Sequence, residues 1–233
     1  MAGFVLAFFC LVRLQYTSNQ LWEIASQQCL PTQKLHHSPG PCLKVDVDKG
    51  YVVFNDARGP LHTLLIPTEQ ITGIESEALL KSRSEHYFDY GWNQRHLLTQ
   101  QAPFVIADGY LAQAINSRFG RTQNQLHIHL ACLKPEVYYS LMQHLPDHRW
   151  QPIDTPLNGS RYFGIRVPAT ADPFALLTEY VRDRHDSMAH YGLLRMMLNP
   201  HEAVLLATRV DLMHLSLGNT ESMLDTDCRL ARD

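Results

Sequence analysis

Two histidines stand two residues apart in the short alternating run QLHIHLA, at positions 127 and 129. If this run is a β-strand, side chains at positions i and i+2 point to the same face, so the two imidazoles stand side by side. Leu126, Ile128 and Leu130 then point the opposite way, toward a hydrophobic core. The pair could be metal ligands, a nucleophile with its helper, or two polar side chains on the solvent face of an ordinary strand.

The segment before this run is rich in hydrogen-bond donors and contains one glycine, Gly120. A glycine can adopt a positive φ and expose backbone amides to an anion. Donors gathered beside imidazoles are typical of a phosphate site, and they weigh against a merely solvated strand face. The donors are Asn116, Ser117, Arg118, Arg121, Thr122, Gln123 and Asn124.

A metal site is a second interpretation, because two histidines on one strand face are good two-ligand geometry and a catalytic zinc takes a third protein ligand. Other histidines are scattered, at positions 62, 86, 96, 185 and 190, and no HExxH motif is present. His185 and His190 could approach the site, but a structural role is favoured for them. No Asp or Glu lies between Asp108 and His129, so no carboxylate is expected beside the pair. We therefore expect neither a metal nor a cofactor.

Covalent catalysis by imidazole is a third interpretation. A neutral histidine attacks phosphorus through one ring nitrogen if the other keeps its proton, hydrogen-bonded to an acceptor that is commonly a backbone carbonyl. A pKa near 6.5 leaves much of a histidine neutral at physiological pH. In phosphoryl transfer the protein mainly supplies donors aimed at the phosphate oxygens, and residues 116–129 contain many.

The elements that position these residues can be read from periodicity and turn residues. Residues 50–67 predict a β-hairpin, and residues 146–168 a loop with an edge strand. Further strands are expected at 111–116, 126–133 and 202–210, and helices at 84–101, from Pro135, and from Asp172 to about His190. Strands and helices interleave without βαβ regularity, and no GxxxxGK[ST] or Gly-rich dinucleotide loop is present. An α+β fold on an antiparallel sheet is therefore expected.

Length and charge limit the classes of partner. A chain of 233 residues fits one globular domain with extra segments. A net charge of −3 and a charged fraction of 18% offer no basic face, which excludes nucleic acid as an expected partner.

The N-terminus opens with an apolar stretch, residues 1–12, that would rise about 18 Å as a helix against a hydrocarbon core of about 30 Å. It lacks the basic region of a signal peptide. Three interpretations remain: the remnant of an uncleaved signal anchor, a weak export signal, or a buried helix. We favour membrane association, with residues 1–20 as anchor or signal remnant and residues 21–233 as the catalytic domain.

Apart from Cys10, the chain has four cysteines: Cys29, Cys42, Cys132 and Cys228. An even number behind an apolar leader is typical of an exported, oxidised domain, although four cysteines permit three pairings. A bridge closing the Pro- and Gly-rich loop from Cys29 to Cys42 would stabilise it by about 3 kcal/mol, which leaves Cys132 with Cys228. There are two alternatives: a metal site formed by Cys29, His36, His37 and Cys42, and free buried thiols.

The run QLHIHLA is similar to the histidine-triad signature His-φ-His-φ-His-φ-φ of the HIT nucleotide hydrolases and transferases, with Gln125 at the first position. From about residue 28 to about residue 228 the chain resembles the bacterial CDP-diacylglycerol pyrophosphatase family, a membrane-anchored branch of the HIT superfamily. The segments that carry this resemblance are QCLP, SPGPC, GYVVFNDARGPLHTLLIPTEQITGIES, AINSRFGRTQNQLHIHLAC, HYGLL and VLLATR. The block INSRFGRTQNQLHIH is the most specific of them.

The resemblance implies a HIT-like fold, a curved antiparallel sheet with flanking helices, and hydrolysis of CDP-diacylglycerol to CMP and phosphatidate through a cytidylyl-histidine. It makes His127 the nucleophile and His129 the residue that supports it and contacts the phosphate. It places Asn116, Thr122 and Gln123 at the α-phosphate. Gln125, a neutral amide, can donate a hydrogen bond but cannot act as an acid or carry charge as a histidine would. Arg118 or Arg121 could offset the pyrophosphate charge. Phosphatidate leaves readily, in keeping with a site that lacks a nearby carboxylate.

The resemblance also implies a lipid-linked nucleotide as substrate and the membrane as partner, with one N-terminal anchor in the bacterial inner membrane and the catalytic domain on the periplasmic side. The sequence identifies no protein partner. Two alternatives stay open: a nucleotidyltransferase that passes CMP to an acceptor other than water, and a non-catalytic nucleotide-binding module.

Overall fold

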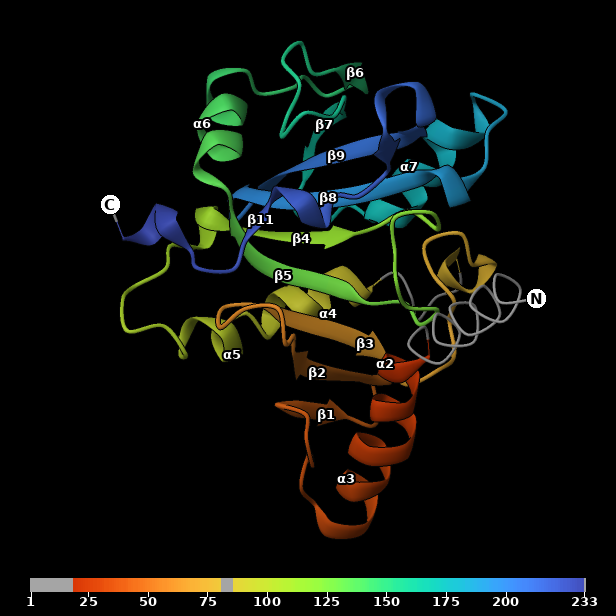
Figure 1. The fold of residues 1–233 in the computed structure, drawn as a ribbon, viewed down its shortest axis with the longest axis vertical. Coiled ribbons are helices and arrows are strands. Elements are labelled where there is room, and N and C mark those ends of the chain that lie inside the picture. The colour runs from red at the N-terminus through yellow and green to blue at the C-terminus, as the bar shows by residue number, and fades with distance from the viewer. Residues whose placement is uncertain (1–18, 81–85, 233) are drawn as a thin grey trace, which may run out of the picture.

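The computed structural model describes residues 19–80 and 86–232, in which eleven strands form one sheet (Figure 1). The strand order is β1-β2-β3-β5-β4-β8-β9-β7-β6, with β10 on β9 and β11 on β5, and the paired strands are antiparallel. The bounds are β1 Lys44–Asp46, β2 Tyr51–Asn55, β3 Thr63–Pro67, β4 Leu111–Ile115, β5 Ile128–Leu133, β6 Gln151–Pro152, β7 Phe163–Pro168, β8 Tyr191–Asn199, β9 Glu202–Asp211, β10 Ser216–Leu217 and β11 Leu224–Asp225. The predicted α+β fold on an antiparallel sheet is thus confirmed.

The helices lie on both faces of this sheet (Figure 1). Their bounds are α2 Gln20–Glu23, a π-helical turn Ile24–Cys29, α3 Leu30–His36, α4 Tyr87–Asn93, α5 His96–Thr99, α6 Pro135–Gln143 and α7 Pro173–Arg182. Proline occupies the first turn of α6 and α7, where its missing N–H is not needed. The Asp172 carboxylate also caps α7, accepting a hydrogen bond from the Phe174 amide at 2.9 Å.

Two of the predicted helices differ from the structure. In place of one helix over residues 84–101, α4 and α5 are separated at Gln94 and Arg95, just after the poor helix formers Gly91 and Asn93. The expected start at residue 84 lies outside the described residues. Helix α7 ends at Arg182, short of His190, because the chain turns back there with His185 at φ 52°. Strand β8 follows and was not predicted, because it is buried on both faces and its sequence YGLLRMMLN does not alternate between apolar and polar residues.

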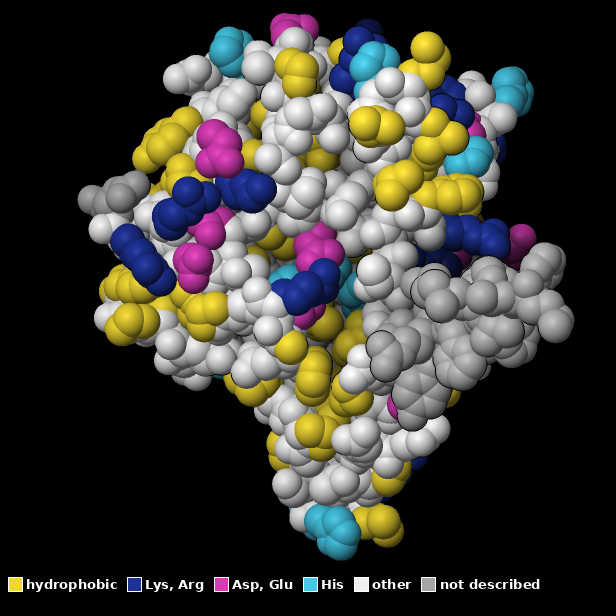
Figure 2. Space-filling view, viewed as in Figure 1, with side chains coloured by type: hydrophobic (Ala, Val, Ile, Leu, Met, Phe, Trp, Pro, Cys, Tyr) yellow, Lys and Arg dark blue, Asp and Glu magenta, His cyan; other side chains and the backbone are white. Residues whose placement is uncertain are grey.

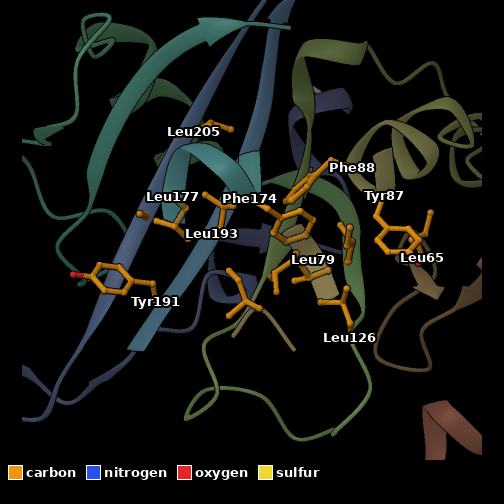
Figure 3. Close-up of a cluster of buried hydrophobic side chains, with 14 of the residues drawn as sticks. Leu65, Leu79, Tyr87, Phe88, Leu126, Phe174, Leu177, Tyr191, Leu193 and Leu205 are labelled. Carbon is orange, nitrogen blue, oxygen red and sulfur yellow. The ribbon is translucent and has the colours of Figure 1, made fainter. Parts of the chain in front are cut away.

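The core has two main layers, one on each face of the sheet. Helices α4 and α7 cover one face, where Phe88, Phe174 and Leu177 pack against strand residues such as Leu65 and Leu193 (Figure 3). Helix α6 and the C-terminal segment cover the other face, with Val137, Leu141 and Met223 against Ala131. The segment Gln20–His36 covers β1–β3 on the same sheet.

Strand β5 pairs with β3, β4 and β11, so it lies in the interior of the sheet. Leu126, Ile128 and Leu130 are buried, as predicted. The opposite face of β5 is buried too, because the C-terminal segment covers it: His127 is 6% exposed and His129 is inaccessible. The alternative in which both histidines occupy a solvent face is therefore wrong.

Both expected disulfides are present. Cys29 bonds to Cys42 with their Cα atoms 5.7 Å apart, and Cys132 bonds to Cys228 with their Cα atoms 5.1 Å apart. The bond between Cys29 and Cys42 consumes both thiols, which excludes the alternative metal site with His36 and His37. The first bond ties the π-helical turn to the start of the sheet, and the second ties the end of β5 to the C-terminal segment.

The apolar N-terminus, residues 1–18, lies outside the described residues. None of the helices in the described part of the chain combines the length and apolar character that crossing a bilayer requires.

Candidate active site

His127 lies one residue before β5, at the end of the polar loop. Its Nδ1 atom is 2.7 Å from the backbone oxygen of Gln125. A carbonyl only accepts, so Nδ1 carries the ring proton and Nε2 keeps the lone pair of the neutral ring. Burial lowers the pKa of His127 below its ordinary value, despite the opposing hydrogen bond to Gln125. This is the tautomer and the backbone partner predicted for a nucleophilic histidine.

A pocket of about 210 Å³ opens beside His127. Its polar lining comes from Thr122 and Gln123 in the loop before β5 and from Asp56 and Arg58 in the turn between β2 and β3. Its apolar lining is formed by Leu21, Ile24, Phe54 and Leu64, and Leu21 lies beside Gln123, whose Oε1 accepts from the Leu21 amide at 3.3 Å. In Figure 2, histidine, acidic and basic side chains meet near the middle of the visible face. The pocket therefore offers a histidine and a guanidinium to a substrate that also has apolar parts.

His129 is held between His127 and a second histidine, His62, which precedes β3. The His129 ring packs edge-on against His127, with centroids 4.8 Å apart and an interplanar angle of 77°. His129 Nδ1 lies 3.0 Å from His62 Nε2, because the β3–β5 register sets Leu64 opposite His129. Burial lowers the pKa of both rings, and for His129 the neighbouring His127 and His62 lower it further. All three imidazoles are therefore neutral at physiological pH.

Two carboxylates flank this row of histidines, so the expectation of a site without a nearby carboxylate is wrong. Glu221 Oε2 lies 3.4 Å from His129 Nε2, and Asp56 Oδ2 lies 3.9 Å from His62 Nδ1. Burial alone would raise the pKa of Asp56, but the hydrogen bonds from Arg58 hold it below the ordinary value. Both acidic residues come from segments far from His129 in sequence.

Arg58 joins the two carboxylates. Its guanidinium lies 2.6 Å from Asp56 Oδ2 and 2.5 Å from Glu221 Oε1. Asn116 holds Glu221 from the other side: Asn116 Nδ2 donates to Glu221 Oε2, and Asn116 Oδ1 accepts from the Glu221 amide, both at 3.0 Å. The hydrogen bond to Asp56 is the main reason that the pKa of Arg58 is raised. Arg58 thus stays charged at the rim of the pocket.

One group of four described residues has the geometry to hold a metal ion: Asp56, His62, His129 and Glu221, whose ligand atoms lie within 4.8 Å of one another. His62 Nδ1 and His129 Nε2 also lack a hydrogen-bond partner among the described residues. However, Arg58 and Asn116 already bond all four carboxylate oxygens of this group. A cation there would lie against the positive Arg58 guanidinium, which already pairs with both carboxylates, so the donor set fits a metal poorly and no step of the chemistry is built on one.

Residues 16–232 match the family model described as CDP-diacylglycerol pyrophosphatase. The chain belongs to the CDP-diacylglycerol pyrophosphatase family. A "CDP-diacylglycerol pyrophosphatase" of Yersinia pestis is 37% identical in an alignment 233 residues long, which covers 97% of this chain and 90% of that protein.

Two solved structures are similar at low sequence identity. A DUF4931 family protein from Bacillus cereus aligns with a TM-score of 0.48 and 14% identity, covering 82% of this chain and 98% of that one. A structure of Hnt3 in complex with DNA and guanosine aligns with a TM-score of 0.33 and 15% identity, covering 68% and 95%.

The predicted phosphate-binding residues of this CDP-diacylglycerol pyrophosphatase family member fall into two groups. Thr122 and Gln123 line the pocket with His127. Gln125 is fully buried: its Nε2 donates to the Pro67 and Glu69 carbonyls at 3.0 and 2.8 Å, and its Oε1 accepts from the Ile71 amide at 3.3 Å. Gln125 therefore anchors the segment after β3.

The predicted arginines do not line this pocket, although Arg121 lines a small cavity of about 10 Å³ together with His127. Arg121 Nη1 is 2.6 Å from Glu75 Oε2, and the backbone amide of Arg118 donates to Ala189 while its side chain is exposed. The guanidinium at the pocket belongs to Arg58 instead. Sequence reasoning missed Arg58, Asp56, His62 and Glu221. The polar residues of the hairpin turn NDARGPLH were a signal for Asp56, Arg58 and His62. No sequence pattern pointed to Glu221.

Proposed function

We propose that the pocket beside His127 hydrolyses CDP-diacylglycerol to CMP and phosphatidate through a cytidylyl-histidine intermediate. Membership of the CDP-diacylglycerol pyrophosphatase family supports the substrate and the products. The observation that carries the intermediate is the hydrogen bond from His127 Nδ1 to the Gln125 carbonyl, which leaves Nε2 as the nucleophilic nitrogen of a ring that lines the pocket.

The reaction takes two displacements at one phosphorus. His127 Nε2 attacks the phosphorus next to cytidine, a P–N bond forms, and the P–O bond to the bridging oxygen breaks, so that phosphatidate leaves with the bonding electron pair. Water then attacks the same phosphorus, the P–N bond breaks, and CMP leaves while the proton of water passes to solvent. The sum adds one water across the anhydride. Because phosphatidate is a phosphate monoester, its departure needs little acid catalysis.

Arg58 supplies the positive charge in this proposal. Its guanidinium lies at the pocket and is held by Asp56 and Glu221, so it is placed before substrate arrives. The pyrophosphate is anionic, and the planar N–H groups of a guanidinium match the spacing of phosphate oxygens. Both properties favour Arg58 as the group that offsets the charge developing on the phosphate. Thr122 and Gln123 add neutral donors in the same pocket.

His129 has a positioning role in this proposal, since it does not line the pocket among the described residues. Its ring packs against that of His127, its Nδ1 lies 3.0 Å from His62 Nε2, and the Glu221 carboxylate lies 3.4 Å from its Nε2. A fixed His129 keeps the His127 ring in the plane that its backbone hydrogen bond requires. Small displacements of a nucleophile change rates strongly, so this support matters to catalysis.

The proposed location is the periplasmic side of the bacterial inner membrane, with residues 1–20 as anchor and residues 21–233 as the catalytic domain. The two disulfides support an oxidising compartment. Tethering would confine the enzyme to the surface that holds its substrate.

The test is to trap the intermediate with CDP-diacylglycerol labelled in the cytidylyl phosphate. Denaturing the wild-type chain during turnover should leave an acid-labile label on the protein, and His127→Ala should lose the label together with about 10³-fold or more in kcat. His144→Ala, at an exposed histidine outside the site, is the matched control and should behave as wild type. CMP release undiminished in His127→Ala, or a label on another residue, would overturn the assignment.

The same reaction, run with added alcohols, separates hydrolysis from transfer. Hydrolysis predicts CMP as the product at all alcohol concentrations that leave the protein folded. Cytidylyl esters of the alcohol, formed at the expense of CMP, would instead make the chain a nucleotidyltransferase.

A further inference from the structure

An exposed apolar tip follows β9. It consists of Leu212, Met213, Leu215 and Leu217, which are 73%, 92%, 90% and 47% exposed, and it is joined by Phe119, which is 52% exposed. Hydrophobic side chains gather at the upper right of Figure 2, over the end of β9. Isolated exposed leucines are ordinary, but four apolar side chains within six residues form a patch of the kind that marks an interaction surface.

The backbone of this tip is held firmly. Asp211 caps the turn Leu212–His214, accepting from the Met213 amide at 3.1 Å, and its other oxygen lies 2.7 Å from His214 Nδ1. Leu215 adopts φ 53°, a left-handed conformation that favours glycine and is rare for leucine. The chain thus holds a large apolar side chain, 90% exposed, where glycine would be less strained. Such an outlier on an exposed apolar residue motivates the hypothesis of a functional contact.

Two exposed arginines, Arg161 and Arg118, lie near the tip. A groove of about 370 Å³ beside it is lined by Arg161, Arg209 and His214, and Arg118 is the neighbour of Phe119 in the chain. Arg161 and Arg118 are exposed, whereas Arg209 is bonded to Asp186 at 2.5 Å. Apolar side chains at a tip with arginines behind them match the layers of an anionic phospholipid surface, where acyl chains lie below phosphate groups.

The tip is joined to the active-site loop by short contacts. Ser117 Oγ donates to the Leu217 carbonyl at 2.5 Å, and the Ser117 amide donates to the Gly218 carbonyl at 3.0 Å. A Cβ at Gly120 would lie 2.9 Å from Leu217 O, so only glycine allows this approach. From Ser117 the loop continues to the pocket residues Thr122 and Gln123, and from Gly218 the chain continues to Glu221.

We propose that this tip is a membrane-contacting surface: Leu212, Met213, Leu215, Leu217 and Phe119 enter the interface of an anionic bilayer and bring the pocket to the plane of its lipid substrate. The inference rests on the proposed lipid substrate and is separate from any role of residues 1–18. Because the tip is fastened to the loop that carries Thr122 and Gln123, contact with the bilayer places the phosphate-binding wall at headgroup level.

The test compares two substrates in the full chain. The tip variant is Leu212→Ser/Met213→Ser/Leu215→Ser, and the matched control is Leu35→Ser/Val105→Ser/Met142→Ser, which also removes three exposed apolar side chains. With long-chain CDP-diacylglycerol in phosphatidylglycerol–phosphatidylcholine vesicles, the tip variant should lose about tenfold or more in kcat/KM. With a water-soluble short-chain analogue it should stay within about twofold of wild type, and the control should do so on both substrates.

Binding to substrate-free vesicles of the same composition gives a readout that does not depend on catalysis. Weaker co-sedimentation of the tip variant than of the control supports the surface, even if neither substrate is hydrolysed and the proposed function fails. Equal rates and equal binding for tip variant and control would overturn it. Equal losses of kcat/KM by the tip variant on vesicles and on the soluble substrate would also overturn it. A further contrary result is a wild-type dimer in light scattering, with a monomeric tip variant whose rate on vesicles is unchanged.

Discussion

His62 Nε2 and His129 Nδ1 lie 3.0 Å apart in the interior of the sheet, and neither ring is open to solvent. Only one of the two nitrogens can donate, so a single proton lies between them. His129 Nε2 faces the Glu221 carboxylate at 3.4 Å, closer than the 3.9 Å between His62 Nδ1 and Asp56. Because a carboxylate accepts, the proton of neutral His129 is favoured on Nε2, and His62 then donates to His129 Nδ1. This chain of contacts fixes the ring against which His127 packs.

The first prediction concerns the contact between His62 and His129. His62→Ala removes the donor to His129 and frees its ring to turn, so kcat should fall by about 10- to 100-fold, the range seen when the support of an active-site ligand is lost. KM should change little, because His62 does not line the pocket among the residues that the structure describes. Steady-state kinetics on a short-chain substrate separates the two parameters.

His62→Gln provides the control for packing, since its amide N–H can replace the lost donor. It should recover part of kcat. A purely structural role would instead lower the amount of folded protein in both variants and leave kcat per folded molecule at the wild-type value.

The second prediction concerns Arg58. Replacing Arg58 with Gln removes the guanidinium at the pocket and leaves Asp56 and Glu221 without their shared partner. We expect kcat/KM to fall by about 10²-fold or more, in line with the loss of one donor to a developing phosphate charge. Arg58→Lys should recover only part, since an ammonium cannot form the paired hydrogen bonds.

Arg182→Gln, at the exposed end of α7, is the matched control for charge and should stay near wild type. Equal kinetics for the Arg58 and Arg182 variants would contradict the role given to Arg58.

Much of the fold could be predicted because its elements carry local signals. The β2–β3 hairpin is marked by its turn residues, β5 by alternation, and α7 by Asp172 and Pro173 at its start. Strand β8 escaped prediction because it is buried on both faces and so has no alternation to detect. Its leucines and methionines also have high helix propensity, which hides a strand further.

The candidate site was predictable only where it is local. The partner of His127 is a carbonyl two residues away, so its tautomer followed from the chemistry expected of a nucleophile. The neighbours of His129 come from elsewhere: His62 through the β3–β5 register, and Glu221 through the C-terminal segment whose strand β11 pairs with β5. Without knowledge of strand pairing, no spacing in the sequence brings these residues together.

The third prediction is the pH dependence of kcat/KM. Catalysis needs neutral His127, and burial lowers its pKa below 6.5. The value of kcat/KM should therefore be at its maximum at neutral pH and should fall only as the pH drops through that lowered pKa. The acid side of the pH profile then has a midpoint below 6.5. Circular dichroism at each pH separates this limb from acid unfolding. A midpoint at or above 6.5 in folded protein would contradict a buried, neutral nucleophile.

The fourth prediction concerns metal removal. Because Arg58 and Asn116 bond the carboxylate oxygens of Asp56 and Glu221, excess chelator should change kcat by less than about twofold, the scatter expected when no catalytic ion is lost. The measurement is CMP release before and after dialysis against EDTA. Loss of activity that one defined divalent cation restores would instead assign a metal to the group of His62 and His129.

The fifth prediction concerns the disulfide between Cys132 and Cys228, which closes a loop with a sequence separation of 96. Replacing both cysteines with Ser should lower the free energy of unfolding by about 4 to 5 kcal/mol, against about 3 kcal/mol for the pair Cys29 and Cys42, because the longer loop gains more entropy in the unfolded chain. Urea unfolding monitored by circular dichroism gives both values.

The two bonds should also differ in their effect on catalysis. Cys228 follows β11, which pairs with β5 at Cys132 and Leu133, and Glu221 lies just before β11. Freed of the bond, this segment can loosen from β5, and His129 then loses its carboxylate partner. We therefore expect Cys132→Ser/Cys228→Ser to lower kcat even at temperatures below the melting transition. Cys29→Ser/Cys42→Ser, remote from Glu221 in the chain, should lower stability with less change in kcat. An unchanged kcat in Cys132→Ser/Cys228→Ser would show that β11 pairing holds Glu221 in place without the bond.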